Sequence, residues 1–313
     1  MDFNKFKEKY QKIAVQHFPH QETPKPLVSV LVQTYNHEAY IEQCLNAILD
    51  QKTKFEFEIL LGEDNSTDTT RKICIEYAQK YPKKIRLFLH HPDNKIRVMN
   101  LVTGNYNAFY NLYSARGKYI AFCEGDDYWT DPFKLQKQID FLDSNKDFVL
   151  SYHCFEEKFE QAPKNLDKLL LEQPQRDLDK NELSGLVQHP LLATVCFRNH
   201  FKYLPEEIFK VLNVDSFIFS LLGKYGKAKF QSGVKTSIYR RHSGGIWTKK
   251  SRETQLFTKL ILFENLILYY SKKDKNLANI FQKKLINTNK MLLIFYLKAL
   301  MPIKAFKLIP KLL

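Results

Sequence analysis

Three carboxylates, those of Glu124, Asp126 and Asp127, directly follow the apolar residues 119–123 and surround a single glycine. The short run of β-favouring residues predicts a buried strand that ends at these acids. Carboxylates packed this closely repel one another unless a cation lies among them. Mg²⁺ or Mn²⁺, which prefer oxygen ligands, would supply that cation. The stretch alone is equally compatible with an acidic surface turn.

Two further polar clusters stand where predicted strands end. The segment 34–36 follows the apolar residues 27–32, and Glu63 and Asp64 follow a strand at residues 55–61. Parallel strands end at one rim of their sheet, and ligands of α/β proteins bind at that rim. The three clusters together predict a binding site there, although polar residues at loop starts also serve as helix caps.

The order of the elements predicts the fold class. Strands are expected at residues 27–32, 55–61, 85–89, 119–123, 148–154 and 191–197, and helices around residues 40–48, 73–77, 106–113, 131–142 and 217–222. This alternation predicts an α/β fold with a mainly parallel sheet between helices. Residues 155–188 are expected to form an acceptor-facing loop or a solvated insertion. Neither Gly-x-Gly-x-x-Gly nor Gly-x-x-x-x-Gly-Lys-Ser/Thr occurs, so glycine loops would not cradle a nucleotide's phosphates.

The formal charge of +14 is concentrated in the C-terminal part. Residues 249–313 hold 14 Lys and Arg residues against 3 acids, a net of +11, which leaves +3 for residues 1–248. We therefore expect no nucleic-acid partner. The 5 cysteines form no Cys-x-x-Cys pair, and their odd number argues against a disulfide framework, which fits a reducing cytosolic setting. The N-terminal residues lack the apolar core of a signal peptide, so export is not expected.

Three segments together resemble glycosyltransferase family 2, whose members have the GT-A fold. They read Val-Ser-Val-Leu-Val-Gln-Thr-Tyr-Asn at 28–36, Gly-Glu-Asp-Asn-Ser-Thr-Asp at 62–68 and Gly-Lys-Tyr-Ile-Ala-Phe-Cys-Glu-Gly-Asp-Asp-Tyr-Trp-Thr-Asp-Pro at 117–132. The resemblance covers residues 27–150 and resumes at 194–199 and 239–247.

This resemblance implies a Rossmann-like GT-A catalytic domain over residues 1–248. Its nucleotide-sugar-binding half would span residues 27–150, and its acceptor-side half residues 151–248. Basic amphipathic helices would follow at residues 249–313.

The resemblance also assigns the nucleotide pocket. Thr34, Tyr35 and Asn36 would line the base and ribose, with strand-end packing as the alternative for Thr34 and Tyr35. Asp64 would accept a hydrogen bond from a uracil ring NH, which favours a UDP-sugar as donor. Glu63 would share the nucleotide contact or only orient the loop.

The reaction implied by the family is transfer of a sugar from a nucleoside diphosphate to a hydroxyl, with inversion. Asp126 and Asp127 match the family's metal-binding motif, with Glu124 at its leading position. We expect Asp127 to be a direct ligand, Asp126 to lie beside it at the donor diphosphate, and Glu124 to support them there. The metal would neutralise charge that develops on the diphosphate. Asp215 matches an acid that precedes a helix in relatives, and we expect it to be the general base or else the helix N-cap.

A second basic segment is expected to cover the bound diphosphate. Arg240, Arg241 and His242 precede the pair Gly244-Gly245. Arginine forms forked hydrogen bonds to phosphate, and His242 would contact phosphate, complete the metal shell or be structural.

The C-terminal part predicts two helices beyond residue 251, the second at residues 278–299. The apolar residues 291–301 are too few to cross a bilayer, which needs roughly 20. Apolar faces interleaved with lysines suit an anionic membrane surface, and a helical cap packed on the catalytic domain is the alternative. We expect a cytoplasmic enzyme, peripheral on the inner face of the membrane, that meets a glycan or lipid-linked acceptor there.

The predicted function is a metal-dependent, inverting glycosyltransferase of bacterial-type surface polysaccharide synthesis. A sugar nucleotidyltransferase is one alternative, but it would need a Gly-rich N-terminal loop, and residues 28–36 contain no glycine. A non-catalytic basic adaptor for a membrane or nucleic acid is another, and salt-sensitive DNA binding without any hydrolysis of a nucleotide sugar would favour it.

Overall fold

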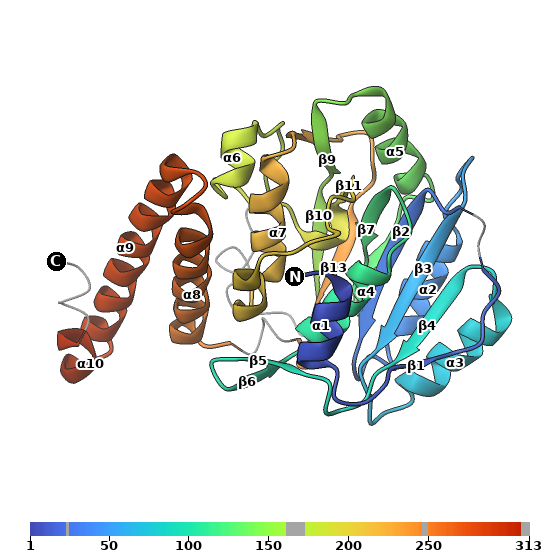
Figure 1. The fold of residues 1–313 in the computed structure, drawn as a ribbon, viewed down its shortest axis with the longest axis horizontal. Helices are drawn as coiled ribbons and strands as arrows, with labels where there is room; N and C mark the ends of the chain where they lie inside the picture. The colour runs from blue at the N-terminus through green and yellow to red at the C-terminus, as the bar shows by residue number, and fades with distance from the viewer. Residues whose placement is uncertain (23–24, 161–172, 246–249, 308–313) are drawn as a thin grey trace.

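The computed structural model describes residues 1–22, 25–160, 173–245 and 250–307. Figure 1 shows a sheet between layers of helices, with a helical hairpin at one end of the molecule.

The central sheet is built around four parallel strands in the order β4, β3, β2 and β7. Their bounds are Ile85–Leu89, Phe57–Glu63, Val28–Thr34 and Tyr119–Phe122. β2 pairs with β3 over its whole length, and nearly every side chain of these two strands is buried. Strands buried on both faces are continuous apolar runs, and the sequence predicted them for that reason.

Alternate residues of β2 contact separate cores on the two faces of the sheet. Val30 and Val32 belong to one core and Leu31 to the other. The first face is covered by α2 (Ile41–Leu49), α3 (Thr70–Lys80) and α5 (Lys134–Ser144), and the second by α1 (Phe3–Tyr10), α4 (Asn105–Ser114) and α7 (Val214–Gly223). This confirms the predicted arrangement of helices on both sides.

The remaining strands make the sheet mixed at its edges. β11 (Cys196–Arg198) runs antiparallel between β7 and β9 (Phe148–Tyr152), and β12 (Lys227–Phe230) is parallel to β9. β1 (Gln16–His17) is antiparallel to β4. The prediction of a mainly parallel sheet holds for its centre.

Three predicted elements differ in the structure. Of the strand predicted at 191–197, Leu192–Thr194 is a 3-10 turn (η2), because the Thr194 hydroxyl donates to the Leu191 carbonyl. The helix predicted from residue 131 begins at Lys134, since the Asp131 carboxylate accepts from the backbone N–H of Phe133. The segment 155–188 is more than a loop, because it contains β10 (Phe155–Phe159) and α6 (Lys180–Ser184); residues 161–172 lie outside the described residues.

A second, small sheet brings strands from the second half of the chain beside the acidic turn. β13 (Ser237–Arg241) lies between β10 and β8 (Tyr128–Trp129). Since β8 follows the acidic turn directly, the residues of β13 stand beside that turn. The hairpin of β5 (Ile96–Val98) and β6 (Leu101–Thr103) precedes α4, and η3 (Glu206–Lys210) precedes α7.

Three helices form the C-terminal hairpin at the left of Figure 1: α8 (Arg252–Tyr270), α9 (Lys275–Lys298) and α10 (Pro302–Phe306). Leu262, Leu266, Tyr270 and Phe281 share a core with α7, so the hairpin packs on the catalytic part as the cap alternative predicted. Within the described ranges, every helix is too short or too polar to span a membrane. The division into domains at residue 248 stays a prediction.

Candidate active site

The loops that follow β2, β3 and β7 are joined at the carboxyl rim of the sheet. The backbone N–H of Gly125 donates to the Gln33 carbonyl at 2.9 Å, and that of Asp64 donates to the Thr34 carbonyl at 3.0 Å. A Cβ at Gly125 would stand 2.8 Å from Thr34 Oγ1 and 2.9 Å from His37 Nδ1. Only glycine fits here, because the acidic turn lies against the β2 loop.

The acidic turn gathers its three carboxylates. Glu124, Asp126 and Asp127 each place an oxygen within 4.8 Å of the others. Asp127 is buried, and its Oδ1 accepts the backbone N–H of Arg240 at 2.9 Å. Burial raises the pKa of Asp127, and the charges of Asp126 and Glu124 raise it further. This repulsion is what a divalent cation would relieve, so the donor set fits one.

Glu124 is the exposed member of the turn. Surrounding protein atoms displace water from its carboxylate, and this desolvation, followed by the charges of Asp126 and Asp215, raises the pKa of Glu124 to about 8.

Asp126 connects the turn to two histidines. Its Oδ2 lies 3.0 Å from Nε2 of His242 and 3.7 Å from Nε2 of His37. Burial opposes ionisation of Asp126, but the hydrogen bond with His242 and the charge of His37 outweigh it and lower the pKa of Asp126. Sequence reasoning missed His37, although it stands directly after Asn36 at the end of the same strand.

Asp64 and Tyr35 form the nucleotide side with Lys95, which the sequence did not single out. Lys95 Nζ lies 2.6 Å from Asp64 Oδ2 and 6.0 Å above the ring of Tyr35, which is 49% exposed. Burial raises the pKa of Asp64 against the opposing charge of Lys95. The buried Oδ1 of Asp64 has no hydrogen-bond partner in the described ranges, so it can accept one from a ligand.

Glu63 has its partners within the protein. Its side chain is fully buried, and its two oxygens accept from the backbone N–H of Ser66 and from Nε of Arg71, each at 2.5 Å. This geometry favours loop orientation over nucleotide contact.

Thr34 and Asn36 shape the β2 loop. Thr34 is buried beneath Gly125, whereas Asn36 adopts a φ of 53° and its Oδ1 accepts the backbone N–H of Thr67 at 2.8 Å. Of the three residues at 34–36, Thr34 is buried, whereas Tyr35 and Asn36 are exposed.

Asp215 lies in the first turn of α7. Its Oδ2 is 3.5 Å from Nε2 of His189, and its charge contributes to the raised pKa of Glu124, so it belongs to the same rim. The N-cap of α7 is Asn213, and Asp215 Oδ1 accepts the backbone N–H of Ser216 at 2.8 Å. The N-cap alternative for Asp215 was therefore wrong.

Arg240 is fixed beside the acidic turn. Its guanidinium lies 5.1 Å from the ring centre of Tyr40 and 4.6 Å from that of Tyr128, and it donates to the Asp126 carbonyl and the Gln43 side chain.

Arg241 points to the other side of β13, where its Nε lies 2.5 Å from Glu157 Oε2. The last residues of this motif, Ile246 and Trp247, lie outside the described residues.

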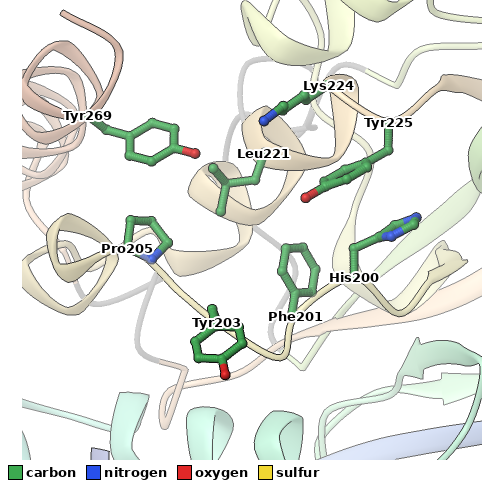
Figure 2. Close-up of a pocket in the computed structure, with 8 residues that line it drawn as sticks. All are labelled: His200, Phe201, Tyr203, Pro205, Leu221, Lys224, Tyr225 and Tyr269. Atoms are coloured by element: carbon green, nitrogen blue, oxygen red, sulfur yellow. The ribbon is translucent and has the colours of Figure 1, made fainter. Parts of the chain in front are cut away.

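The pocket in Figure 2 is separate from the residues of the candidate active site. It is lined by His200, Phe201, Tyr203, Pro205, Leu221, Lys224, Tyr225 and Tyr269, none of them a predicted site residue.

A comparison with known families decides the class of the protein. The family model described as Glycosyl transferase family 2 matches residues 29–196. The chain belongs to glycosyltransferase family 2. Membership confirms the resemblance and supports an enzyme of the transferase class.

Relatives of this family 2 glycosyltransferase include an uncharacterized protein of Mycobacterium tuberculosis. The two are 32% identical over 224 residues, which is 70% of this chain and 60% of that relative. The chain therefore spans about 60% of the length of such curated relatives.

Two solved structures confirm the α/β GT-A fold of this family 2 member. S. aureus TarS 1–349 in complex with UDP-GlcNAc has a TM-score of 0.53 at 17% identity, over 90% of both chains. The mannosyltransferase PcManGT from Pyrobaculum calidifontis, in complex with GDP-Man and Mn²⁺, has a TM-score of 0.52 at 14% identity, over 93% of this chain and 81% of that one.

Proposed function

We propose that this glycosyltransferase transfers a sugar, with inversion, from a UDP-sugar to a hydroxyl of a glycan or lipid-linked acceptor, and that it requires Mg²⁺ or Mn²⁺. The observation that carries the proposal is the acidic turn, whose three carboxylates converge within 4.8 Å.

The donor would bind with its base against Asp64. The free Oδ1 of Asp64 is a suitable acceptor for a uracil NH, and Tyr35 offers an open ring face. The complex of TarS with UDP-GlcNAc supports a uridine donor, whereas the complex of PcManGT with GDP-Man keeps a guanosine donor as the competing choice.

Asp126, Asp127 and His242 would hold the cation, with Glu124 beside the donor. A divalent cation supplies positive charge where the diphosphate leaves. Arg240, fixed beside the turn, would add a second positive charge at the diphosphate. Arg241 is paired with Glu157, so it would contribute at the diphosphate only by sharing or leaving that pairing.

Asp215 would act on the acceptor. Its carboxylate takes the proton from the attacking hydroxyl, and attack on the face opposite the diphosphate inverts the anomeric carbon. The backbone N–H of Ser216, which donates to Oδ1 at 2.8 Å, holds the carboxylate in place.

A panel of UDP-, GDP- and CDP-sugars tests this function. We expect nucleotide release from a UDP-sugar, abolished by EDTA and restored by Mn²⁺ or Mg²⁺. Release that survives EDTA would contradict the metal requirement, and release from GDP- or CDP-sugars alone would contradict the uridine preference.

We also propose that the hairpin rests on an anionic membrane at the cytoplasmic face, where a lipid-linked acceptor would be met. Leu297, Leu300, Ile303 and Phe306 are 56, 87, 75 and 75% exposed near the end of the hairpin. Residues 275–313 contain 8 lysines and no acidic residue, although 308–313 lie outside the described residues. Apolar side chains among lysines fit the interface of an anionic bilayer.

A further inference from the structure

Asp126 lies between two imidazoles that come from different halves of the chain. His37 belongs to the loop after β2, and His242 follows β13. One ligand atom from each of His37, Asp126 and His242 lies within 4.8 Å of the other two. The ligand atoms of one ion with bonds of about 2.1 Å stand about 3 to 4 Å apart, so these three atoms are close to metal-ligand spacing.

His37 lacks the hydrogen bonds expected of an imidazole in such a place. Its Nε2 is 3.7 Å from Asp126 Oδ2, which is longer than a hydrogen bond, and its Nδ1 is buried without a partner in the described part of the chain. A buried polar atom without a partner needs an explanation. A ligand on Nε2 would fix the ring by a stronger contact than the long one to Asp126.

The backbone already holds His37 in this position. Its N–H donates to Thr70 Oγ1 at 2.8 Å, and its carbonyl accepts from the backbone N–H groups of Tyr40 and Ile41 at 2.9 Å each, where α2 begins. These bonds fix the main chain of His37 at the start of α2, so its side chain leaves from a defined position.

A supporting group for the other ring nitrogen is next to it. Thr34 Oγ1 is also buried without a hydrogen-bond partner in the described ranges, and, like His37 Nδ1, it lies within 3 Å of where a Cβ on Gly125 would stand (2.8 and 2.9 Å). Ligating histidines commonly donate their second N–H to such an oxygen, which fixes the tautomer.

We propose that His37 is a further ligand of the cation assigned above to Asp126, Asp127 and His242, so that the centre has two nitrogen donors and is selective for Mn²⁺ or Co²⁺ over Mg²⁺. The inference rests on the proposed metal dependence and deepens it, since carboxylates alone would suit Mg²⁺ equally well. Imidazole nitrogen favours first-row transition ions, whereas Mg²⁺ prefers an octahedron of oxygens. Because His37 belongs to the β2 loop, the ion would also join the nucleotide side to the acidic turn.

The test measures metal binding without any sugar donor. Mn²⁺ alone is titrated into the full chain and the free ion is followed by electron paramagnetic resonance, with Mg²⁺ then added as competitor. We expect Mg²⁺ to bind at least about tenfold more weakly than Mn²⁺. His37→Gln should weaken Mn²⁺ binding at least about tenfold and Mg²⁺ binding less, so that the preference falls.

The matched control is His200→Gln, which changes an exposed histidine stacked on Tyr225 with ring centres 4.1 Å apart. It should bind Mn²⁺ like the wild type. Circular dichroism of each metal-free variant separates loss of ligand from loss of fold. Wild-type affinity for Mn²⁺ in His37→Gln, equal affinity for both ions, or no Mn²⁺ binding at all would overturn the proposal. Failure of the proposed function would instead appear as no turnover of any donor by a protein that still binds Mn²⁺.

Discussion

The ammonium group of Lys95 lies 2.6 Å from Oδ2 of Asp64, so one oxygen of this buried carboxylate is paired while Oδ1 stays available. The pair joins the loop after β4 to the loop after β3. Burial raises the pKa of Asp64, and the positive charge of Lys95 opposes that rise.

Asp64→Asn should weaken UDP binding about tenfold to a hundredfold, because a hydrogen bond to a charged acceptor contributes about 1.5–3 kcal/mol. Isothermal titration calorimetry with UDP measures the change. Asp93→Asn, in the next loop and paired only with His91, is the control and should bind UDP normally. Unchanged UDP affinity in Asp64→Asn would refute the uracil contact.

Asp215→Asn should lower kcat by about 10² to 10⁴ while the donor affinity stays the same, since the amide cannot take a proton. Nucleotide release under saturating donor and acceptor gives kcat, and calorimetry gives donor affinity. Asp274→Asn, which alters the N-cap of α9, is a suitable control. An Asp215→Asn enzyme as active as the wild type would remove this carboxylate from the reaction.

Asp127 offers a comparison of two substitutions. Asp127→Ala removes the acceptor of the Arg240 N–H and should cost about 1–3 kcal/mol in unfolding free energy, whereas Asp127→Asn keeps an acceptor and should cost less. Both should abolish metal-dependent release, because neither has a carboxylate for the cation. Urea unfolding and the release assay are measured on the same samples, and metal-stimulated turnover by Asp127→Asn would contradict the assignment.

His153 should make the fold sensitive to mild acid. Burial, followed by the charge of Lys134, lowers the pKa of His153 to about 3 from its ordinary 6.5. Between these values the unfolded chain binds a proton that the folded protein does not, so the unfolding free energy falls as pH falls, by up to about 1.4 kcal/mol per pH unit. Above about pH 6.5 the effect is absent.

Urea unfolding at about pH 7.5 and about pH 5.5 measures this loss. His153→Gln should show a smaller loss than the wild type. An equal loss in both proteins would assign the acid sensitivity to other groups, of which buried His90, with its pKa also lowered to about 3 by burial, is the first.

The membrane proposal is best tested by substitutions on the surface. Deleting residues 290–313 would also remove Leu292 and Tyr296 from the small core between α8 and α9, so loss of binding would be ambiguous. Leu300→Ser, Ile303→Ser and Phe306→Ser together change only exposed side chains and should weaken sedimentation with anionic liposomes at least about tenfold. Neutral liposomes are the control, and binding unaffected by the three substitutions would refute the proposed contact.

The sequence predicted those parts of the fold that depend on local pattern. The strand at 85–89 and the helix around 106–113 match β4 and α4, because the spacing of their apolar residues follows directly from which side chains are buried. The three polar clusters were predicted to lie at one rim because parallel strands end at the same edge of their sheet.

What the sequence did not predict depends on partners far along the chain. The pairing of β13 with β8, which brings His242 to Asp126, is indicated by no periodicity within residues 237–241; only the resemblance to the family suggested His242 for the metal shell. Lys95 and His189 were missed because a single charged residue in a loop has the same appearance whether or not it faces an acid. The 3-10 turn at Leu192–Thr194 was missed because its apolar residues also suit a strand.

The hairpin of α8, α9 and α10 gives the molecule a permanent electrical polarity. Within the described residues 250–307, 12 Lys and Arg residues stand against 3 acids, a net charge of +9 at one end of the body. In the field of any anionic surface such a body experiences a torque as well as an attraction. It would turn its hairpin toward the surface before touching it, so that the orientation of the catalytic rim is set during approach. Added salt shortens the range of the field and would weaken this orienting effect.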